Sequence, residues 1–457
     1  MEGSVEDRRS NRTRAGAEES RPPASGLLAR RDFEAASLAL SPADLAPAET
    51  GRQGMGGTSL ALHNLRGVVI LIVVAFHSAL AYLGSSPPSP FPFDEPPYQW
   101  RAFAIIDTHR FFGFDLFCAW QDVYLMALMF FLSALFTWPS LARKGVARFL
   151  TDRLLRLGAP FLFGVGVMMP IALYPVYRVT ASDPSLSAYG RHFLALPFWP
   201  NGPMWFLWQL LALTIAAAAL RRFWPDAVER LARRLSQARS RPGSSFAWLA
   251  AASALAYVPL AIAFTPWRWA DHGPLALQFS RPLLYALYYF LGLVVGAAGL
   301  ERGLLASGGV LARGWRLWLA LAATFLFAWM GLTGLTLSEG ASSPLLLQLA
   351  ADIAFAATCA ASLFFAMALA LRFGALRSPL LDSLARNAMG IYILHYAPVV
   401  WLQYALLGTS LPAVAKAAIV FSAALAASWS ATAVLRGIPY CCRLIGEEGR
   451  LARRVAP

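Results

Sequence analysis

Two ionisable side chains on one apolar stretch are the first candidates for chemistry in this chain. Arg66 and His77 lie in the run HNLRGVVILIVVAFHSALAYL, residues 63–83, and are 11 residues apart. At about 100° per residue, this spacing puts both on one helix face, with Cα atoms roughly 16 Å apart along the axis. Histidine is the side chain that exchanges protons most readily near neutral pH. The pattern predicts a helix with a cation at one end and a proton-transfer group deeper inside.

The same stretch is long enough to cross a bilayer, which takes about 20 mostly apolar residues. Arg66 then lies at a membrane boundary and His77 near mid-bilayer, where an ionisable side chain is a functional-site hypothesis by default. The alternative is a buried histidine bonded to a backbone carbonyl. His395, in RNAMGIYILHY on a later apolar segment, has a similar expected depth. The two histidines are therefore candidates for lining one cavity, and helix-packing hydrogen bonds remain the alternative.

Other charged residues lie within or beside apolar segments. Asp352 is expected to be the partner of a buried His or Ser, with a proton-linked role as the alternative, because such residues usually pair. Lys416 is close enough to a segment end to extend to the interface. Arg153 and Arg156, in DRLLRLGAP, are three residues apart and share a helix face. Membrane orientation alone explains any single basic residue at that position.

The composition indicates how these residues are positioned. The chain has 457 residues, of which 58% are hydrophobic and 14% charged, and its mean hydropathy is +0.52. Soluble domains are roughly 45–50% apolar and 25% charged, so we predict an all-α polytopic membrane protein. About ten membrane helices are expected, at approximately residues 63–83, 123–138, 157–177, 204–220, 247–264, 282–300, 317–337, 344–371, 387–407 and 411–435.

The basic residues predict the orientation of these helices. Loops between even and odd helices, together with the C-terminal tail, hold 23 Lys or Arg, whereas the loops on the other side hold six. An excess of Lys and Arg marks the cytoplasmic side, so both ends of the chain are expected in the cytoplasm. This topology also accounts for the net charge of +14 without a nucleic-acid partner.

Three regions follow from the same patterns. Residues 1–58 lack a sustained apolar run and are expected to be a disordered cytoplasmic tail, residues 59–438 the transmembrane domain, and residues 439–457 a basic cytoplasmic tail. The outer loop after the first helix is rich in proline and aromatic residues, and residues 105–122 are expected to form an interfacial helix. The four cysteines have no metal-ligand spacing, so no metal site is predicted.

Taken in order, these motifs resemble the acyltransferase-3 family of membrane acyltransferases. That family carries an Arg and a His with ten residues between them in its first membrane helix, as Arg66 and His77 are, and Arg-x-x-Arg at the entry to its third helix, as Arg153 and Arg156 are. WFL at 205–207 and GIYILH at 390–395 are similar too, and the resemblance spans about residues 60–435. HNLRG, FFLSALFTWPSLARKG and PMWFLWQLL look closest to the branch that includes glucan biosynthesis protein C, which is associated with succinylation of periplasmic glucans.

The resemblance implies an integral membrane O-acyltransferase of the cytoplasmic (inner) membrane. It would move an acyl group of the acetyl or succinyl class from cytoplasmic acyl-CoA to a hydroxyl of a glycan or other cell-envelope acceptor on the outer side. Arg66, Arg153 and Arg156 would bind the phosphates of acyl-CoA, since the planar guanidinium can hold two oxygens. His77 and His395 are the catalytic candidates, with His77 either a general base or an acyl-carrying nucleophile. Acyl-CoA is expected as a co-substrate, with no permanently bound cofactor.

Two questions stay open at this point. Aromatic residues of the outer loops are candidates for stacking on sugar rings, although an interfacial belt explains each of them individually: Phe91, Phe93, Trp199, Trp267 and Trp269. A polytopic transporter or flippase of an envelope precursor is the alternative function. No internal repeat is visible in the sequence, which disfavours that alternative. The acyl chain, the acceptor and the oligomeric state are left open by the sequence.

Overall fold

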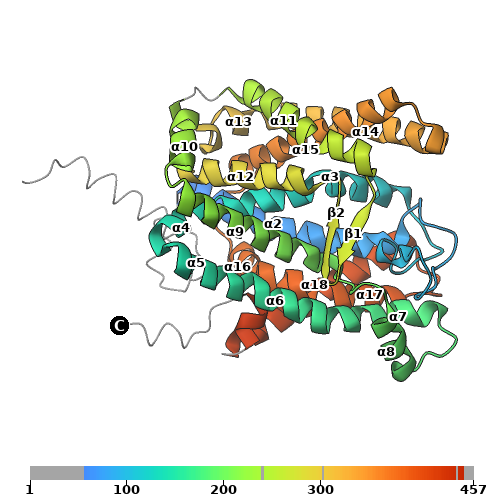
Figure 1. Ribbon diagram of the computed structural model, residues 1–457. Coiled ribbons are helices and arrows are strands. Elements are labelled where there is room, and N and C mark those ends of the chain that lie inside the picture. The colour runs from blue at the N-terminus through green and yellow to red at the C-terminus, as the bar shows by residue number, and fades with distance from the viewer. Residues whose placement is uncertain (1–55, 238–240, 301–302, 439–440, 447–457) are drawn as a thin grey trace, which may run out of the picture.

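The computed structural model describes residues 56–237, 241–300, 303–438 and 441–446. The predicted disordered tail, residues 1–58, and the predicted basic tail, residues 439–457, lie mostly outside these ranges. The described residues form a bundle of long helices that run side by side across the molecule (Figure 1). The all-α polytopic prediction is confirmed.

Eight helical segments among the described residues are long and apolar enough to cross a membrane. They are α2–η2 (Gly57–Tyr82), α3–α4 (Phe112–Lys144), α5–α7 (Val146–Thr180), η6–α9 (Gly202–Phe223), α11 (Pro242–Phe264), α14 (Trp315–Glu339), α15 (Leu345–Phe373) and α18 (Ala413–Gly437). Two further predicted spans take a different form. One is the shorter helix α12 (Pro282–Ala298), and the other is divided into α16 (Pro379–Leu394) and α17 (Tyr396–Ala405). The count of about ten stays a prediction.

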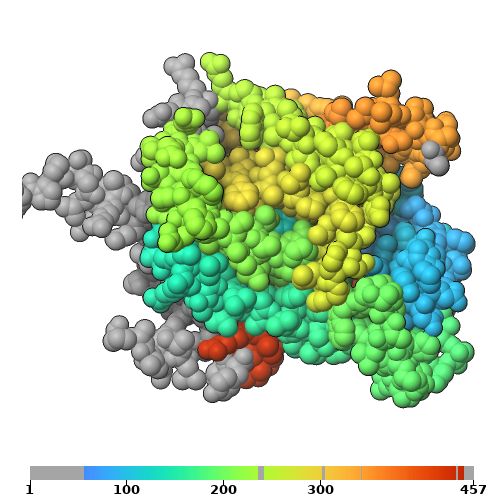
Figure 2. Space-filling view, viewed as in Figure 1, coloured from blue at the N-terminus to red at the C-terminus, as the bar shows by residue number. Residues whose placement is uncertain are grey.

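The two ends of the bundle are built differently. The hairpin end consists of the segment 84–111, α8 (Leu186–Ala195) and a β-hairpin, and in Figure 2 the segment 84–111 (blue), α8 (green) and the end of α14 (orange) gather on this side. The basic end, opposite in Figure 1, consists of α4 (Thr137–Lys144), α10 (Ala227–Gln237) and α13 (Val310–Arg313). Most of the loop Lys and Arg residues belong to the basic end, which we therefore expect on the cytoplasmic side.

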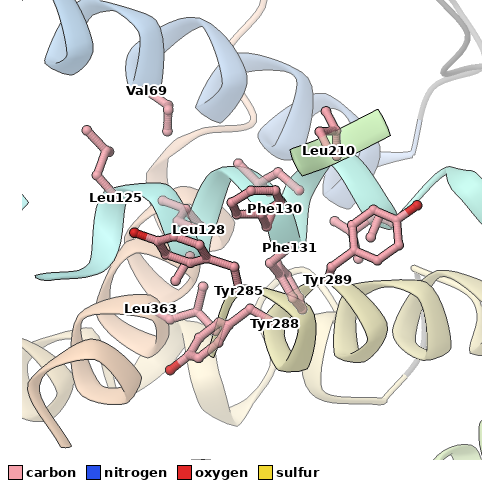
Figure 3. Packing of buried hydrophobic residues seen from close by; sticks show 14 of the residues in the cluster. Val69, Leu125, Leu128, Phe130, Phe131, Leu210, Tyr285, Tyr288, Tyr289 and Leu363 are labelled. Atoms are coloured by element: carbon pink, nitrogen blue, oxygen red, sulfur yellow. The ribbon is translucent and has the colours of Figure 1, made fainter. Parts of the chain in front are cut away.

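The core lies where α3 (Phe112–Ala134) meets α12 and α15. Phe130 and Tyr285 are buried there and stack with ring centroids 5.0 Å apart. Leu363 of α15 and Val69 of α2 belong to the same cluster (Figure 3). The helix that carries Arg66 and His77 is therefore held against the centre of the bundle by apolar packing.

Close approach of α3 and α12 depends on two glycines. A Cβ atom at Gly292 would collide with the carbonyl oxygen of Phe131, and one at Gly296 with that of Leu135. Small residues four apart are a common contact between membrane helices because they let the backbones meet. Side chains at these two positions would push the core helices apart.

A short β-hairpin at the hairpin end was not predicted. Strands β1 (Trp269–His272) and β2 (Leu275–Gln278) are antiparallel, and Gly273 in the turn has φ of 56°, a value that glycine adopts without steric cost. Strands of four residues are too short for an alternating pattern to be recognised. Asp271 accepts two hydrogen bonds of 2.7 Å from Arg101, which ties the hairpin to the segment 84–111.

The predicted interfacial helix over residues 105–122 is wrong, because α3 begins at Phe112 and includes the second half of that stretch. Asp115 in its first turn accepts hydrogen bonds from the backbone N–H groups of Gly84 and Ser85, at 2.6 and 2.9 Å. Phe93 is buried and stacks on Trp100 with centroids 4.8 Å apart. Phe93 is therefore part of the packing of the outer segment and not a free surface for a sugar ring.

The span α5–α7 contains two π-helical segments, η4 (Leu154–Gly158) and η5 (Gly164–Met168). Each is followed by a proline, Pro160 and Pro170. Proline has no backbone N–H, and its ring clashes with the carbonyl four residues earlier, so regular α-helix is interrupted there. Widened turns of this kind are frequent at functional sites, and η4 contains Arg156.

Candidate active site

His77 lies in the last turn of α2 (Gly57–Ala79), toward the hairpin end. Its Nδ1 is 2.9 Å from the carbonyl oxygen of Val73, one turn earlier. The backbone carbonyl of His77 accepts a hydrogen bond of 2.8 Å from the side-chain amide of Gln403. The rings of Phe76 and Tyr396 stand edge-on to the imidazole, with centroids 5.3 and 5.4 Å away. These contacts orient a histidine that is itself partly exposed.

His395 lies at the junction of α16 and α17 and is fully buried, with 0% of its surface exposed. The sequence predicted one continuous helix over residues 387–407, and that helix is interrupted at His395. Pro398 accounts for the interruption, because it has no N–H to donate to the carbonyl of Leu394. The Nδ1 of His395 is 2.7 Å from the carbonyl oxygen of Tyr392.

The two imidazoles are in contact. The Nε2 of His395 is 3.3 Å from the Nδ1 of His77. A carbonyl oxygen can only accept, so a neutral imidazole whose Nδ1 faces a carbonyl carries its hydrogen on that nitrogen. His395 therefore donates from Nδ1 and presents an acceptor at Nε2. The Nδ1–H of His77 is shared between that acceptor and the carbonyl of Val73.

This arrangement leaves the lone pair on the Nε2 of His77 unshared. Within the described part of the chain, no residue makes a hydrogen bond to this nitrogen. If Nε2 takes a proton, the positive charge of the ring is stabilised by the Val73 carbonyl and by the lone pair of His395. The geometry suits a His77 that accepts a proton and a His395 that orients it.

The three arginines of the predicted donor site also come together. Arg153 ends α5 (Val146–Arg153), and both Arg66 of α2 and Arg156 of η4 are near enough to interact with it electrostatically. The guanidinium of Arg153 lies 5.1 Å from the ring centroid of Phe149. Like charges gathered in this way produce a positive potential that attracts anions. The tertiary structure therefore gathers the three arginines around the position of Arg66 on α2. It gathers the two histidines around His77, farther along the same helix.

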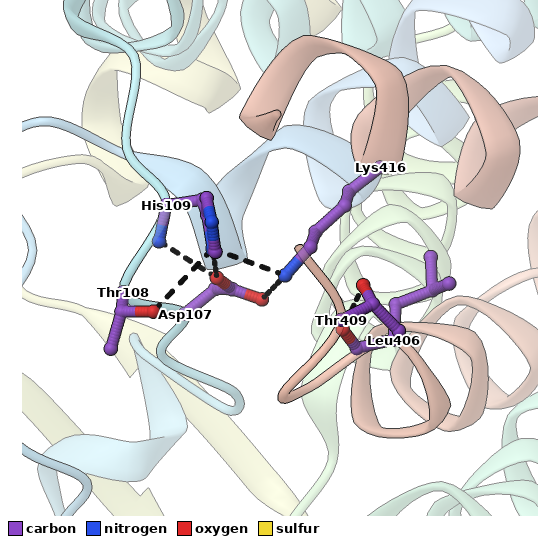
Figure 4. Close-up of polar contacts among 6 residues, drawn as sticks. All are labelled: Asp107, Thr108, His109, Leu406, Thr409 and Lys416. Carbon is purple, nitrogen blue, oxygen red and sulfur yellow. Dashed lines mark hydrogen bonds and ion pairs between the residues drawn. The ribbon is translucent and has the colours of Figure 1, made fainter. Parts of the chain in front are cut away.

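A polar cluster near the site was missed by the sequence analysis (Figure 4). The Nζ of Lys416 is 2.7 Å from the Oδ2 of Asp107, and the two side chains are 0% and 2% exposed. Lys416 therefore does not extend to the interface, and that prediction is wrong. The backbone N–H of His109 donates to the Oδ1 of Asp107 at 2.8 Å. The backbone N–H of Asp107 donates to the carbonyl of Ala81, one turn beyond His77.

Burial raises the pKa of the Asp107 carboxyl, but hydrogen bonds from Lys416 and from the backbone N–H of His109 outweigh burial and hold the pKa below its usual range. Asp107 is therefore a charged carboxylate at neutral pH. The signal that could have found this pair is its charge: a lysine in an apolar helix requires an acidic partner.

Asp352 does not pair as expected. It is 6% exposed, and its carboxylate makes no hydrogen bond or ion pair with any residue that the structure describes. It lies on α15 and lines a cavity apart from the two histidines. Among the described residues, no three His, Cys, Asp or Glu side chains are grouped so that they could hold a metal ion.

Comparison with known proteins gives one match. The family described as an acyltransferase domain, acyltransferase 3, matches residues 59–433. Those residues include the arginines, both histidines and Lys416. Neither the comparison with curated proteins nor the comparison with solved structures finds a match.

Proposed function

Because this chain belongs to the acyltransferase-3 family, we propose that it moves an acyl group from cytoplasmic acyl-CoA to a hydroxyl of a glycan or other envelope acceptor on the outer side. Membership of the family makes the chain a membrane enzyme that transfers acyl groups other than amino-acyl groups. We propose the identity of the donor, the identity of the acceptor and the role of each site residue. The acyl group is of the acetyl or succinyl class. The resemblance to the glucan biosynthesis protein C branch favours succinyl as the acyl group and a glucan as the acceptor.

The arginine cluster supports the choice of donor. Acyl-CoA is made in the cytoplasm and carries several phosphate charges, and the guanidinium fork binds two phosphate oxygens at once. In this proposal Arg66, Arg153 and Arg156 bind the nucleotide part at the basic end. The thin pantetheine arm then runs along α2, over the roughly 16 Å that separates Arg66 from His77, and brings the thioester to the histidines.

The transfer itself needs one proton acceptor. The acceptor hydroxyl gives its proton to the Nε2 of His77 while its oxygen bonds to the thioester carbonyl carbon. The carbon–sulfur bond then breaks, and the sulfur takes the proton back from His77 as the CoA thiol leaves. The products are an acyl ester and CoA. His395 does not touch the reacting atoms in this scheme and is a positioning residue that holds His77 in the required tautomer.

The observation that carries this proposal is the contact between His77 and His395. The carbonyls of Val73 and Tyr392 fix the hydrogen of each imidazole on its Nδ1. The Nε2 of His77 therefore keeps a free lone pair, which a general base requires. A role as acyl-carrying nucleophile uses the same nitrogen and is the alternative for the chemical step.

The test is acyl transfer by the purified protein in detergent or nanodiscs. Succinyl-CoA and acetyl-CoA are each offered with a panel of neutral oligosaccharides, and the ester product and released CoA are measured together. Equal amounts of ester and CoA in the wild-type protein, with loss of both in His77→Ala, are expected. Release of CoA without any ester on any acceptor, or full transfer by His77→Ala, would overturn the proposal. Radiolabelled ester left on the protein when no acceptor is present would select the nucleophile over the base.

A further inference from the structure

A cavity at the hairpin end lies apart from the two histidines. It has a volume of about 370 Å³ and is bounded by α11, α14, α15 and the segment 265–281. Within the described part of the chain, none of its lining belongs to α2, α16 or α17. Figure 1 shows α11, α14 and α15 along one side of the bundle and α16 and α17 toward the other. Ligand pockets begin at about 300 Å³, so the volume suits a small molecule or a headgroup.

Two hydrogen-bond acceptors on α15 line this cavity. Asp352 is 6% exposed, and its carboxylate has no hydrogen bond or ion pair among the described residues. Neither of its oxygens is among the inaccessible unpaired atoms of those residues, so the carboxylate is open to the cavity. Gln348 lies one helical turn earlier on the same face. Its Nε2 donates to the carbonyl of Ser343 at 2.9 Å, which leaves its Oε1 as an acceptor.

The charge in this lining is negative. Arg281 also lines the cavity, but its terminal nitrogens donate to the carboxylate of Asp122, which balances its charge. The Nε of Arg281 and the Oγ of Ser343 are inaccessible, so neither can donate to a ligand. The carboxylate of Asp352 is therefore left without a compensating charge from any described residue. A buried carboxylate is costly in that state, so the cavity favours a cation and disfavours an anion.

The aromatic lining favours an organic cation. Phe355 is already in use, because its ring stacks on Tyr257 with centroids 4.2 Å apart and lies 5.2 Å from the guanidinium carbon of Arg281. Trp267 and Trp329 also line the cavity, and both are at least partly exposed. A cation within about 6 Å of an indole face is attracted by the ring electrons, and tryptophan is the best of the aromatic side chains for this contact.

A metal ion fits this lining poorly. Hard cations such as Ca²⁺ take about 6–8 oxygen ligands, and Asp352 is the one carboxylate among the described lining residues. The two acceptors also distinguish between organic cations. A primary ammonium has three N–H donors to offer to Asp352 and Gln348, whereas a quaternary ammonium has none. The lining therefore selects a primary ammonium group.

The surroundings of the cavity point to a lipid as the carrier of this group. Only 22% of the apolar part of α11 and 11% of that of α14 are buried within the protein, against 78% for α15. The exposed faces of α11 and α14 are therefore expected to contact lipid. The cavity lies where α11 ends at Phe264, α14 ends at Glu339 and α15 begins at Leu345. Ends of membrane helices lie at the level of the lipid headgroups.

We propose that this cavity binds a primary ammonium group, carried by the ethanolamine-type headgroup of a membrane lipid. Asp352 and Gln348 accept hydrogen bonds from the ammonium, and Trp267 and Trp329 lie against it. A free alkylamine presents the same chemistry and is distinguished from the lipid in the test below. The site is separate from the histidine pair, and its binding does not depend on the acyl-transfer proposal.

The test is native mass spectrometry of the full-length purified protein, which counts bound lipid molecules. Phosphatidylethanolamine, phosphatidylcholine and phosphatidylglycerol with the same acyl chains are titrated in parallel. We expect phosphatidylethanolamine to bind about tenfold more tightly than phosphatidylcholine, which has no N–H donors, and phosphatidylglycerol, which has no cation, to bind most weakly. Equal binding of the three lipids would overturn the proposal.

Variants assign this binding to the cavity. Asp352→Asn should weaken the binding of phosphatidylethanolamine about tenfold, because it removes the negative charge, and Gln348→Leu should weaken it about threefold to tenfold. Glu339→Gln is the matched control, because Glu339 is an exposed carboxylate at the same end of α14 that does not line the cavity. Unchanged binding in both cavity variants would overturn the proposal. If Asp352→Asn fails to fold by size-exclusion chromatography, Gln348→Leu decides alone.

Two further measurements identify the carrier and separate this site from the reaction. Butylamine is titrated into the delipidated protein by calorimetry. Affinity equal to that of the lipid would assign the site to a free amine, whereas affinity at least about tenfold weaker would assign it to the lipid headgroup. His77→Ala should bind phosphatidylethanolamine as the wild type does, so that loss of acyl transfer in that variant leaves this site unaffected.

Discussion

The Nζ of Lys416 and the Oδ2 of Asp107 form a buried ion pair, 2.7 Å apart, that joins α18 to the outer segment 84–111. The two residues are 309 positions apart in the sequence. Asp107 is also bonded through its backbone N–H to Ala81, directly after the helix that carries His77. The pair therefore connects the outer segment, α18 and the end of α2 at a single point beside the candidate active site.

Breaking this pair should destabilise the protein strongly. Lys416→Met leaves the Asp107 carboxylate buried without its partner, which typically costs about 3–5 kcal/mol. Lys416→Met combined with Asp107→Asn should recover most of that loss, because no uncompensated charge remains. Thermal unfolding in detergent measures both. Lys144→Met is the control, since Lys144 pairs with Asp152 at a partly exposed site and should cost about 1 kcal/mol or less. Equal losses of stability in Lys416→Met and Lys144→Met would contradict the role of the Lys416–Asp107 pair in stabilising the fold.

The same pair predicts a dependence on pH. The pKa of Asp107 is below its usual range in the folded state. Stability from such a group is fully present above the unfolded pKa, about 3.9, and is lost as pH falls through the folded pKa. The contribution of this pair to the unfolding temperature should therefore be nearly constant between about pH 8 and pH 5. It should decrease below about pH 4. The acid loss should be smaller in the Lys416→Met and Asp107→Asn double variant than in the wild type.

His77→Ala should lower turnover by about 10²–10⁴, the usual contribution of a general base. Donor binding should be largely kept, because the arginines remain. His395→Ala should cost less, and it should shift the pH profile of turnover, since it removes the acceptor that orients the Nδ1–H of His77. His272→Ala is a control at an exposed histidine of the β-hairpin, at the same end of the molecule. A greater loss in His395→Ala than in His77→Ala would move the base to the junction of α16 and α17.

Arg153→Ala and Arg156→Ala should each raise the dissociation constant for acyl-CoA about tenfold to a hundredfold, as expected for loss of a charged hydrogen bond. Arg148→Ala is the matched control, because Arg148 lies on the same segment and is exposed. The dissociation constant is measured with a nonhydrolysable acyl-CoA analogue, so that turnover does not affect the result. Unchanged donor affinity in both variants, with the proteins folded, would exclude the arginine pair from the donor site.

Membrane orientation can be checked with reporter fusions. A reporter placed after Ser89, in the segment 84–111, should be on the outer side, and one placed after Gln237, at the end of α10, should be cytoplasmic. The physical reason is the excess of Lys and Arg at the basic end. Both reporters on the same side would refute the orientation, and with it the separation of donor and acceptor between the two ends.

Local patterns were sufficient for much of the architecture. Hydropathy and segment length predicted the all-α membrane class, because each spanning segment must by itself be apolar and long enough to cross the lipid. The spacing of Arg66 and His77 on α2 was readable for the same reason, since helical periodicity depends only on neighbours in sequence. The order of short motifs led to the family that the comparison then matched over residues 59–433.

Partners were decided by the tertiary structure. His77 and His395 are 318 positions apart, and nothing local specifies that one nitrogen faces the other. Lys416 was expected to reach the interface and instead pairs with Asp107, while Asp352 was expected to pair and instead lines a cavity. Each outcome depends on which helix packs beside which, and that is set by the summed burial of many apolar side chains. The sequence by itself determined which residues are chemically capable, and packing alone decided which of them meet.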